Sequence, residues 1–133
     1  MMRWFKRNQL DPIDETPVFR TDPVLEAESH TLMKITSMCL VTHHSAEIAG
    51  SSTITDDDAR MRRERQRFES AKRLSLGLAK GITDEVYRDI ALHEVVELCM
   101  KANDVTTARL LVRVIQTQTI REKILDRHPV AFY

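Results

Sequence analysis

The sequence predicts an all-α fold: a small antiparallel bundle of about four helices, with a C-terminal helical hairpin and an irregular N-terminal arm. Two observations lead to this fold class. The 133 residues include three glycines and four prolines, too few for the many turns of a β fold. Apolar residues also recur at a helical period of about 3.6 residues along most of the chain. A chain of this length suits one domain, so we expect residues 1–21 to form the arm and residues 22–133 a single helical-bundle domain.

Prolines separate the N-terminal arm from the first long helix, predicted over residues 22–49. Pro12 and Pro17 interrupt any continuous helix in the arm. Asp22 followed by Pro23 is typical of a helix start, because aspartate caps free N–H groups and proline fits the first helical position. Gly50 is a good terminator. The main apolar face recurs at seven-residue spacing: Leu25, Leu32, Cys39 and Ala46.

The second helix is predicted over residues 55–80. Thr55 and Asp58 fit a capping box, in which the first side chain caps the helix and the second reaches back toward it. Gly81 is expected to end the helix. Its apolar seam consists of Phe68, Ala71, Leu74 and Leu78.

Residues 83–102 and 104–127 are predicted to form the helical hairpin. We expect Thr83 to cap the first of these two helices. Asn103 tolerates the left-handed backbone of a tight turn, and Asp104 can cap the next helix. The first helix is apolar over about half of its circumference, so it must be covered on more than one side.

The last predicted helix contains a conflict within its own pattern. Residues 112–120 are rich in β-branched side chains, which favour strands over helices. Ile120 and Ile124 also fall on the helix face opposite Leu111. We keep the segment helical and expect that it either breaks near Thr117 or meets a different neighbour in its second half.

The sequence carries none of the common catalytic motifs. It has no glycine-rich phosphate loop, no paired cysteine motif and no His-Glu-x-x-His zinc motif. Asp89, His93 and Glu97 share one helix face at four-residue spacing. Ligands on successive turns spread over more than about 10 Å, so three of them do not converge on one ion. We therefore expect a solvated face here, and no enzymatic activity, cofactor or metal.

The densest charge is a run of arginines in the second helix. Residues 60–81 carry eight Lys or Arg against two Glu, although the whole chain has a net charge of zero. Arginine forms bidentate hydrogen bonds with phosphates and carboxylates. The candidates for a partner or phosphate contact are Arg60, Arg62, Arg63, Arg65, Arg67 and Arg73. Three interpretations stand: a solvated face, a contact with a partner protein, and nucleic-acid binding, which lacks support from interleaved aromatics or helix-turn-helix spacing.

Apolar residues away from the main stripes indicate an interaction surface. Uncovered apolar area on a small domain usually marks an interface. Off-stripe residues of the first helix are Met33, Leu40, Val41 and Ile48. Those near the C-terminus, which we predict to form an apolar interface, are Ile120, Ile124, Phe132 and Tyr133.

These patterns lead to one hypothesis of function and one alternative. The first is a non-catalytic helical interaction protein that self-associates, for example as a homodimer, or docks onto a partner protein through apolar helix faces. The alternative is a nucleic-acid-binding helical module that uses the basic helix Arg60–Arg67 on phosphates.

The two cysteines and the hydropathy of the chain bear on its compartment. Cys39 and Cys99 each lie in an apolar stripe, which favours buried free thiols over a disulfide. Residues 1–10 lack the apolar core of a signal peptide, and no run approaches the roughly 18 apolar residues of a membrane span. We expect a cytoplasmic protein without a membrane span.

Overall fold

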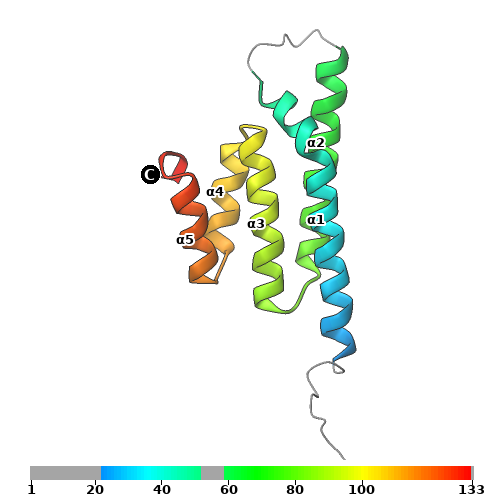
Figure 1. The fold of residues 1–133 in the computed structure, drawn as a ribbon, viewed down its shortest axis with the longest axis vertical. Coiled ribbons are helices and arrows are strands. Elements are labelled where there is room, and N and C mark those ends of the chain that lie inside the picture. The colour runs from blue at the N-terminus through cyan, green and yellow to red at the C-terminus, as the bar shows by residue number, and fades with distance from the viewer. Residues whose placement is uncertain (1–21, 52–58, 133) are drawn as a thin grey trace, which may run out of the picture.

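Figure 1 shows the structure, a computed structural model that describes residues 22–51 and 59–132. Every regular element within these residues is helical, which confirms the all-α prediction for this part of the chain. The elements are α1 (Pro23–Ala49), α2 (Ala59–Lys80), α3 (Glu85–Lys101), α4 (Val105–Val114), α5 (Gln118–Arg127) and the short 3₁₀ helix η2 (Val130–Phe132). The predicted arm and the predicted cap at Thr55 and Asp58 lie outside the described residues. None of the described helices is long and apolar enough to cross a bilayer.

The central element is α3, which lies between α1 and α2 on one side and α4 and α5 on the other (Figure 1). The most extensive contacts join α1 to α2, and both of these helices also pack on α3. Successive helices point alternately up and down in the view of Figure 1. The largest fully buried apolar side chains are Ile35, Met61, Val95, Val96, Ile115 and Ile124.

Both ends of α1 are set by the residues that the sequence indicated, although Gly50 acts for a different reason. Asp22 Oδ1 accepts a hydrogen bond from the Val24 N–H at 3.0 Å, as expected for a cap followed by proline. Gly50 has a right-handed φ of −85°, so the turn itself does not require glycine. A Cβ at Gly50 would lie 2.6 Å from the carbonyl oxygen of Lys101. Glycine is needed because the end of α1 touches the backbone at the end of α3.

The cap of α3 differs from the prediction. Asp84, not Thr83, caps the helix, and its carboxylate accepts a hydrogen bond from the Tyr87 N–H at 2.9 Å. The Thr83 N–H and hydroxyl instead donate to Glu28 of α1 at 2.6 and 2.7 Å, and the Asp84 N–H donates to the same carboxylate at 2.9 Å. These bonds lower the pKa of Glu28 in spite of its burial. A carboxylate from α1 thus holds the start of α3.

The turn between α3 and α4 confirms the prediction made for it. Asn103 has a φ of 62°, the left-handed backbone expected there. Asp104 caps α4, because its carboxylate accepts a hydrogen bond from the Thr107 N–H at 3.3 Å.

The predicted helix over 104–127 breaks near Thr117, one of the two outcomes expected for it: α4 ends at Val114 and α5 starts at Gln118. The described residues therefore contain five α-helices where we expected about four. The break has a partner in α3. The Asp89 carboxylate accepts hydrogen bonds from the Gln116 N–H at 3.0 Å, the Thr117 N–H at 2.7 Å and the Thr117 hydroxyl at 2.7 Å. This break turns the second half of the segment back toward α3, where Ile124 is fully buried.

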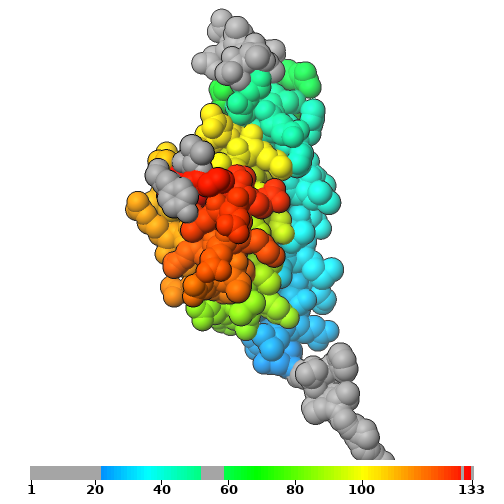
Figure 2. Space-filling model, turned by 60° about the vertical axis from the view of Figure 1, so that its left-hand side comes forward, coloured from blue at the N-terminus to red at the C-terminus, as the bar shows by residue number. Residues whose placement is uncertain are grey.

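The prediction of a solvated face at Asp89, His93 and Glu97 is also wrong. Asp89 is fully buried, and the side chains of His93 and Glu97 are 22% and 20% exposed. The reason is α5, which folds over this side of α3; Figure 2 shows α5 in front of it.

Candidate functional site

Two helices that pack on α3 leave an open groove over it. α2 and α4 each pack on α3 but make little contact with each other. Between them lies a groove of about 790 Å³, which we call the α2–α4 groove. Leu110 and Val114 line it and are 55% and 52% exposed. Its remaining apolar lining consists of Leu76, Ala79, Leu92 and Leu111.

The polar rim of the α2–α4 groove is basic. Arg73 and Lys80 reach it from α2, Arg88 reaches it from α3, and Gln116 closes the end beyond α4. No acidic residue is among the described residues that line it. Among the residues that the structure describes, no carboxylate forms an ion pair with Arg73, Lys80 or Arg88. Uncompensated positive charge therefore surrounds an apolar floor.

Gly77 lines this groove in the interior of α2, where glycine lacks an obvious local reason. Glycine in a helix interior costs about 1 kcal/mol relative to alanine. A Cβ at Gly77 would meet no atom within 4 Å, so packing within the chain does not require the glycine. The missing side chain leaves open space beside the α2 backbone at this point of the groove.

Polar contacts fix both ends of the groove. At one end, Lys72 of α2 donates a hydrogen bond to Asp104, the cap of α4, at 2.7 Å. Burial alone would lower the pKa of Lys72, but its bonds to Asp104 and Glu69 raise it, which favours the charged form. At the other end, Asp89 binds the segment that begins at Gln116. The separation of α2 and α4 is therefore set by contacts made within the chain.

The predicted arginine site is divided between faces of α2. Arg60 is exposed at the start of the helix. One depression, shared with α1, is bordered by Arg63 and Arg67, and another by Arg62, Arg65 and Arg73. Arg67 also forms an ion pair with Glu64 at 3.1 Å. Of the six arginines, Arg73 is the one that also lines the α2–α4 groove.

The residues predicted to form a C-terminal apolar interface are largely covered by the chain itself. Ile124 is fully buried, and Ile120 and Phe132 are half-buried and pack against the core. Tyr133 lies outside the described residues. We therefore place no interaction surface at Ile124.

The off-stripe residues of α1 divide into exposed and buried ones. Met33, Leu40 and Val41 are 62%, 73% and 78% exposed, whereas Ile48 is buried. Leu40 and Val41 border depressions that also contain charged and hydroxyl side chains. Neither depression has the continuous apolar floor of the α2–α4 groove.

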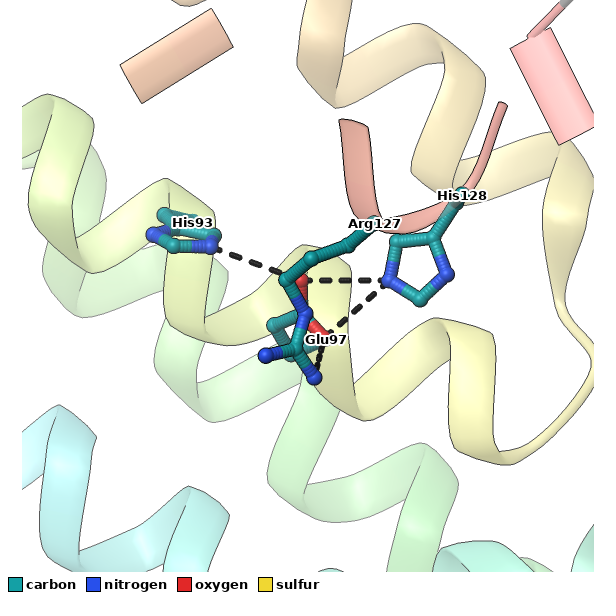
Figure 3. A network of polar contacts seen from close by, with 4 residues as sticks. All are labelled: His93, Glu97, Arg127 and His128. Atoms are coloured by element: carbon teal, nitrogen blue, oxygen red, sulfur yellow. Dashed lines mark hydrogen bonds and ion pairs between the residues drawn. The ribbon is translucent and has the colours of Figure 1, made fainter. Parts of the chain in front are cut away.

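A polar cluster around Glu97 joins α3 to the end of α5 (Figure 3). His128 Nε2 lies 3.1 Å and Arg127 Nη2 3.3 Å from Glu97 Oε1, and His93 Nε2 lies 3.4 Å from Oε2. Burial raises the pKa of Glu97, but the imidazole of His93 close by, the hydrogen bonds and charge of His128 and the charge of Arg127 outweigh it and lower the pKa to about 2.

The Glu97 cluster does not have the arrangement of a metal centre. The two imidazoles approach the carboxylate from opposite sides, and the Arg127 guanidinium occupies a third direction (Figure 3). Among the described residues, no group of three or more His, Cys, Asp or Glu can hold a metal ion. The cluster therefore serves to attach α5 to α3.

The two cysteines are buried free thiols, as predicted. Burial raises the pKa of Cys39 to about 11 and that of Cys99 to about 12. Because the thiolate is the reactive form, neither side chain is prepared for nucleophilic chemistry.

The sequence analysis missed Gly77, Leu110 and Val114. Two signals were available: a glycine within a predicted helix, and two apolar residues four apart, hence on one face, in a segment without acids. Neither signal reveals that α2 and α4 border the same groove.

Comparisons with protein-family models, curated proteins and solved structures found no match to this chain.

Proposed function

We propose that this protein is a non-catalytic docking protein that receives a helix of a partner protein in the α2–α4 groove. The observation that carries the proposal is the exposure of two apolar side chains in the groove lining, Leu110 and Val114, which are 55% and 52% exposed. Apolar area of this kind usually marks an interaction site. The predictions of a cytoplasmic location and of no enzymatic activity belong to the same proposal.

The dimensions of the groove favour a helix as the occupant. Arg73 and Lys80, which mark its length on α2, are seven residues apart, or about 10 Å along the helix axis. This length matches about two turns of a helix laid between α2 and α4. An amphipathic helix in an apolar groove is a common mode of protein recognition.

A second copy of the chain is a poorer occupant of the same surface. In a two-fold dimer, each groove would face its own equivalent. The rims contributed by Arg73, Lys80 and Arg88 would then oppose one another, which disfavours the pairing.

Nucleic acid is also a poorer occupant than a protein helix. The six predicted arginines project from more than one face of α2 and border different depressions. They therefore do not form one continuous phosphate-binding surface. The groove contains no aromatic side chain for base stacking among its described lining residues.

Site-specific photo-crosslinking tests the proposal. A benzophenone amino acid at Leu110 or Val114 would lie in the groove, whereas one at Val86, which is 50% exposed and outside it, is the matched control. Irradiation in the cells that make the protein should yield the same crosslinked partner protein from both groove positions and not from the control. Equal products from all three positions, or products from the control position alone, would refute docking in this groove.

A further inference from the structure

We infer that the partner segment is an acidic amphipathic helix, which pairs an apolar stripe with the groove floor and carboxylates with the basic rim. This inference rests on the proposed function and adds the chemical class of the partner. Its basis is charge complementarity between the occupant and the lining residues.

The sign of the charge is specific to this side of α3. Arg73, Lys80 and Arg88 surround the α2–α4 groove without an acidic lining residue. On the side of α3 that faces α1, the corresponding depression has a mixed lining, in which Glu94 and Glu97 accompany Lys101 and His43. A cationic helix would therefore meet repulsion in the α2–α4 groove, and a neutral one would leave the rim charges without partners.

The flanking helices extend the positive field beyond the rim. α2 carries eight Lys or Arg against two Glu, and α4 carries Arg109 and Arg113 and no acid. Long-range attraction of this kind speeds the encounter with an anionic partner and weakens as salt is added.

The spacing of the rim cations predicts the pattern of the partner. Arg73 and Lys80 are seven residues apart and so lie on the same side of α2, about two turns apart. Two acids at positions i and i+7 along one edge of the incoming helix would match them. Gly77 lies between these cations in sequence, where the absence of a side chain lets the partner helix come close to α2.

The test is a selection for charge. A displayed library of two-to-four-turn helices would keep one apolar stripe constant and vary the flanking positions among Glu, Lys and Gln. It would be selected on the full-length protein, on the charge-reversed variant Arg73→Glu/Lys80→Glu, and on the control Lys123→Glu, which changes an exposed residue of α5 outside the groove lining and outside its flanking helices.

We expect Glu to be enriched at least tenfold over Lys at flanking positions i and i+7 on the wild-type and Lys123→Glu proteins. The preference should reverse on Arg73→Glu/Lys80→Glu. Gly77→Leu, which places a side chain into open space on the groove floor, should weaken the selected helices at least tenfold, whereas Gly77→Ala should weaken them far less.

The failures of the two proposals are distinguishable. Binders that are lost on Leu110→Asp but show no preference for Glu would overturn the acidic partner and leave the docking groove in place. An absence of enriched binders, or binders that tolerate both Leu110→Asp and Gly77→Leu, would overturn both proposals. Circular dichroism of each variant establishes that it is folded before it enters the selection.

Discussion

Replacing Asp89 with alanine should detach α5 from α3. The Asp89 side chain is fully buried, and one of its oxygens, Oδ2, accepts three hydrogen bonds at 3.0, 2.7 and 2.7 Å from the segment between α4 and α5. Three donors around one carboxylate oxygen form charge-assisted bonds at the N-terminus of α5, where the helix dipole also favours negative charge. Alanine removes the acceptor and the charge together.

The magnitude follows from the geometry of these bonds. Hydrogen bonds to a charged group contribute about 1.5–3 kcal/mol each, but three that share one oxygen are not additive. The donors belong to Gln116, which is exposed, and Thr117, which is half-buried. Water therefore replaces part of the hydrogen bonding that these donors lose when the Asp89 carboxylate is removed. We therefore expect Asp89→Ala to lower the free energy of unfolding by about 2–4 kcal/mol, a large share of the total for a small domain.

Asp89→Asn separates the shape of the side chain from its charge. The amide oxygen can still accept the three bonds, whereas its NH₂ group would take the place of Oδ1, which has no hydrogen-bond partner among the described residues. This variant should lose about 1–2 kcal/mol, less than alanine.

Urea unfolding at neutral pH, followed by circular dichroism, measures these losses, and hydrogen exchange locates them. Amides of Gln118–Arg127 should exchange faster in Asp89→Ala, while those of α1 should change little at low denaturant. A loss below about 0.5 kcal/mol, or unchanged protection of α5, would show that Asp89 does not hold this helix and would refute the reasoning.

Four further predictions follow from charge, burial and close approach. Because the pKa of Glu97 is about 2 in the folded protein and 4.5 for the free group, its ionised form stabilises the fold above about pH 4.5 and this contribution is lost as the pH falls through 2. The difference in unfolding free energy between wild type and Glu97→Gln should therefore shrink as the pH falls from about 4.5 toward 2; a difference that stays constant over this range would contradict it. Gly50→Ala should destabilise the protein by about 1–3 kcal/mol, because its Cβ would press on the backbone at the end of α3. Gly77→Ala should stabilise the protein by about 0.5–1 kcal/mol, because no atom lies close to the new methyl group. Urea unfolding measures both glycine variants, and equal effects of Gly50→Ala and Gly77→Ala on the unfolding free energy would contradict both predictions. Cys39 and Cys99 should not react with a thiol reagent such as dithionitrobenzoate at pH 8 in the native protein, and both should react in denaturant; rapid labelling of the native state would disprove their burial.

Local signals in the sequence were enough to predict most helix ends. Asp22 and Asp104 cap their helices as predicted, and Asn103 takes up the left-handed backbone of the turn. These features depend on atoms a few residues apart, so the sequence nearby contains the information. Burial of the two cysteines was predictable for a similar reason, since the apolar stripes that contain them are regular.

The candidate site was less predictable, because its parts come from different helices. The sequence revealed the basic charge of α2 and the apolar character of residues 105–114, but it did not reveal that Arg73, Leu110 and Arg88 line one groove. A helical pattern shows which residues share a face, and not which other helix lies opposite that face.

By itself, the sequence determined that this protein is helical and where most of its helices begin and end. It predicted the buried stripes in part: Phe68 and Ala71 of the α2 seam are buried, whereas Leu74 of that seam is 60% exposed and Leu25 of the α1 stripe is 40% exposed. The tertiary structure decided the rest. The break before α5 depends on Asp89, which lies 27 residues earlier, and the start of α3 depends on Glu28, which lies 55 residues before Thr83. Capping and amphipathic periodicity act over a few residues along the chain, whereas a buried carboxylate or an open groove exists only once distant helices are brought together.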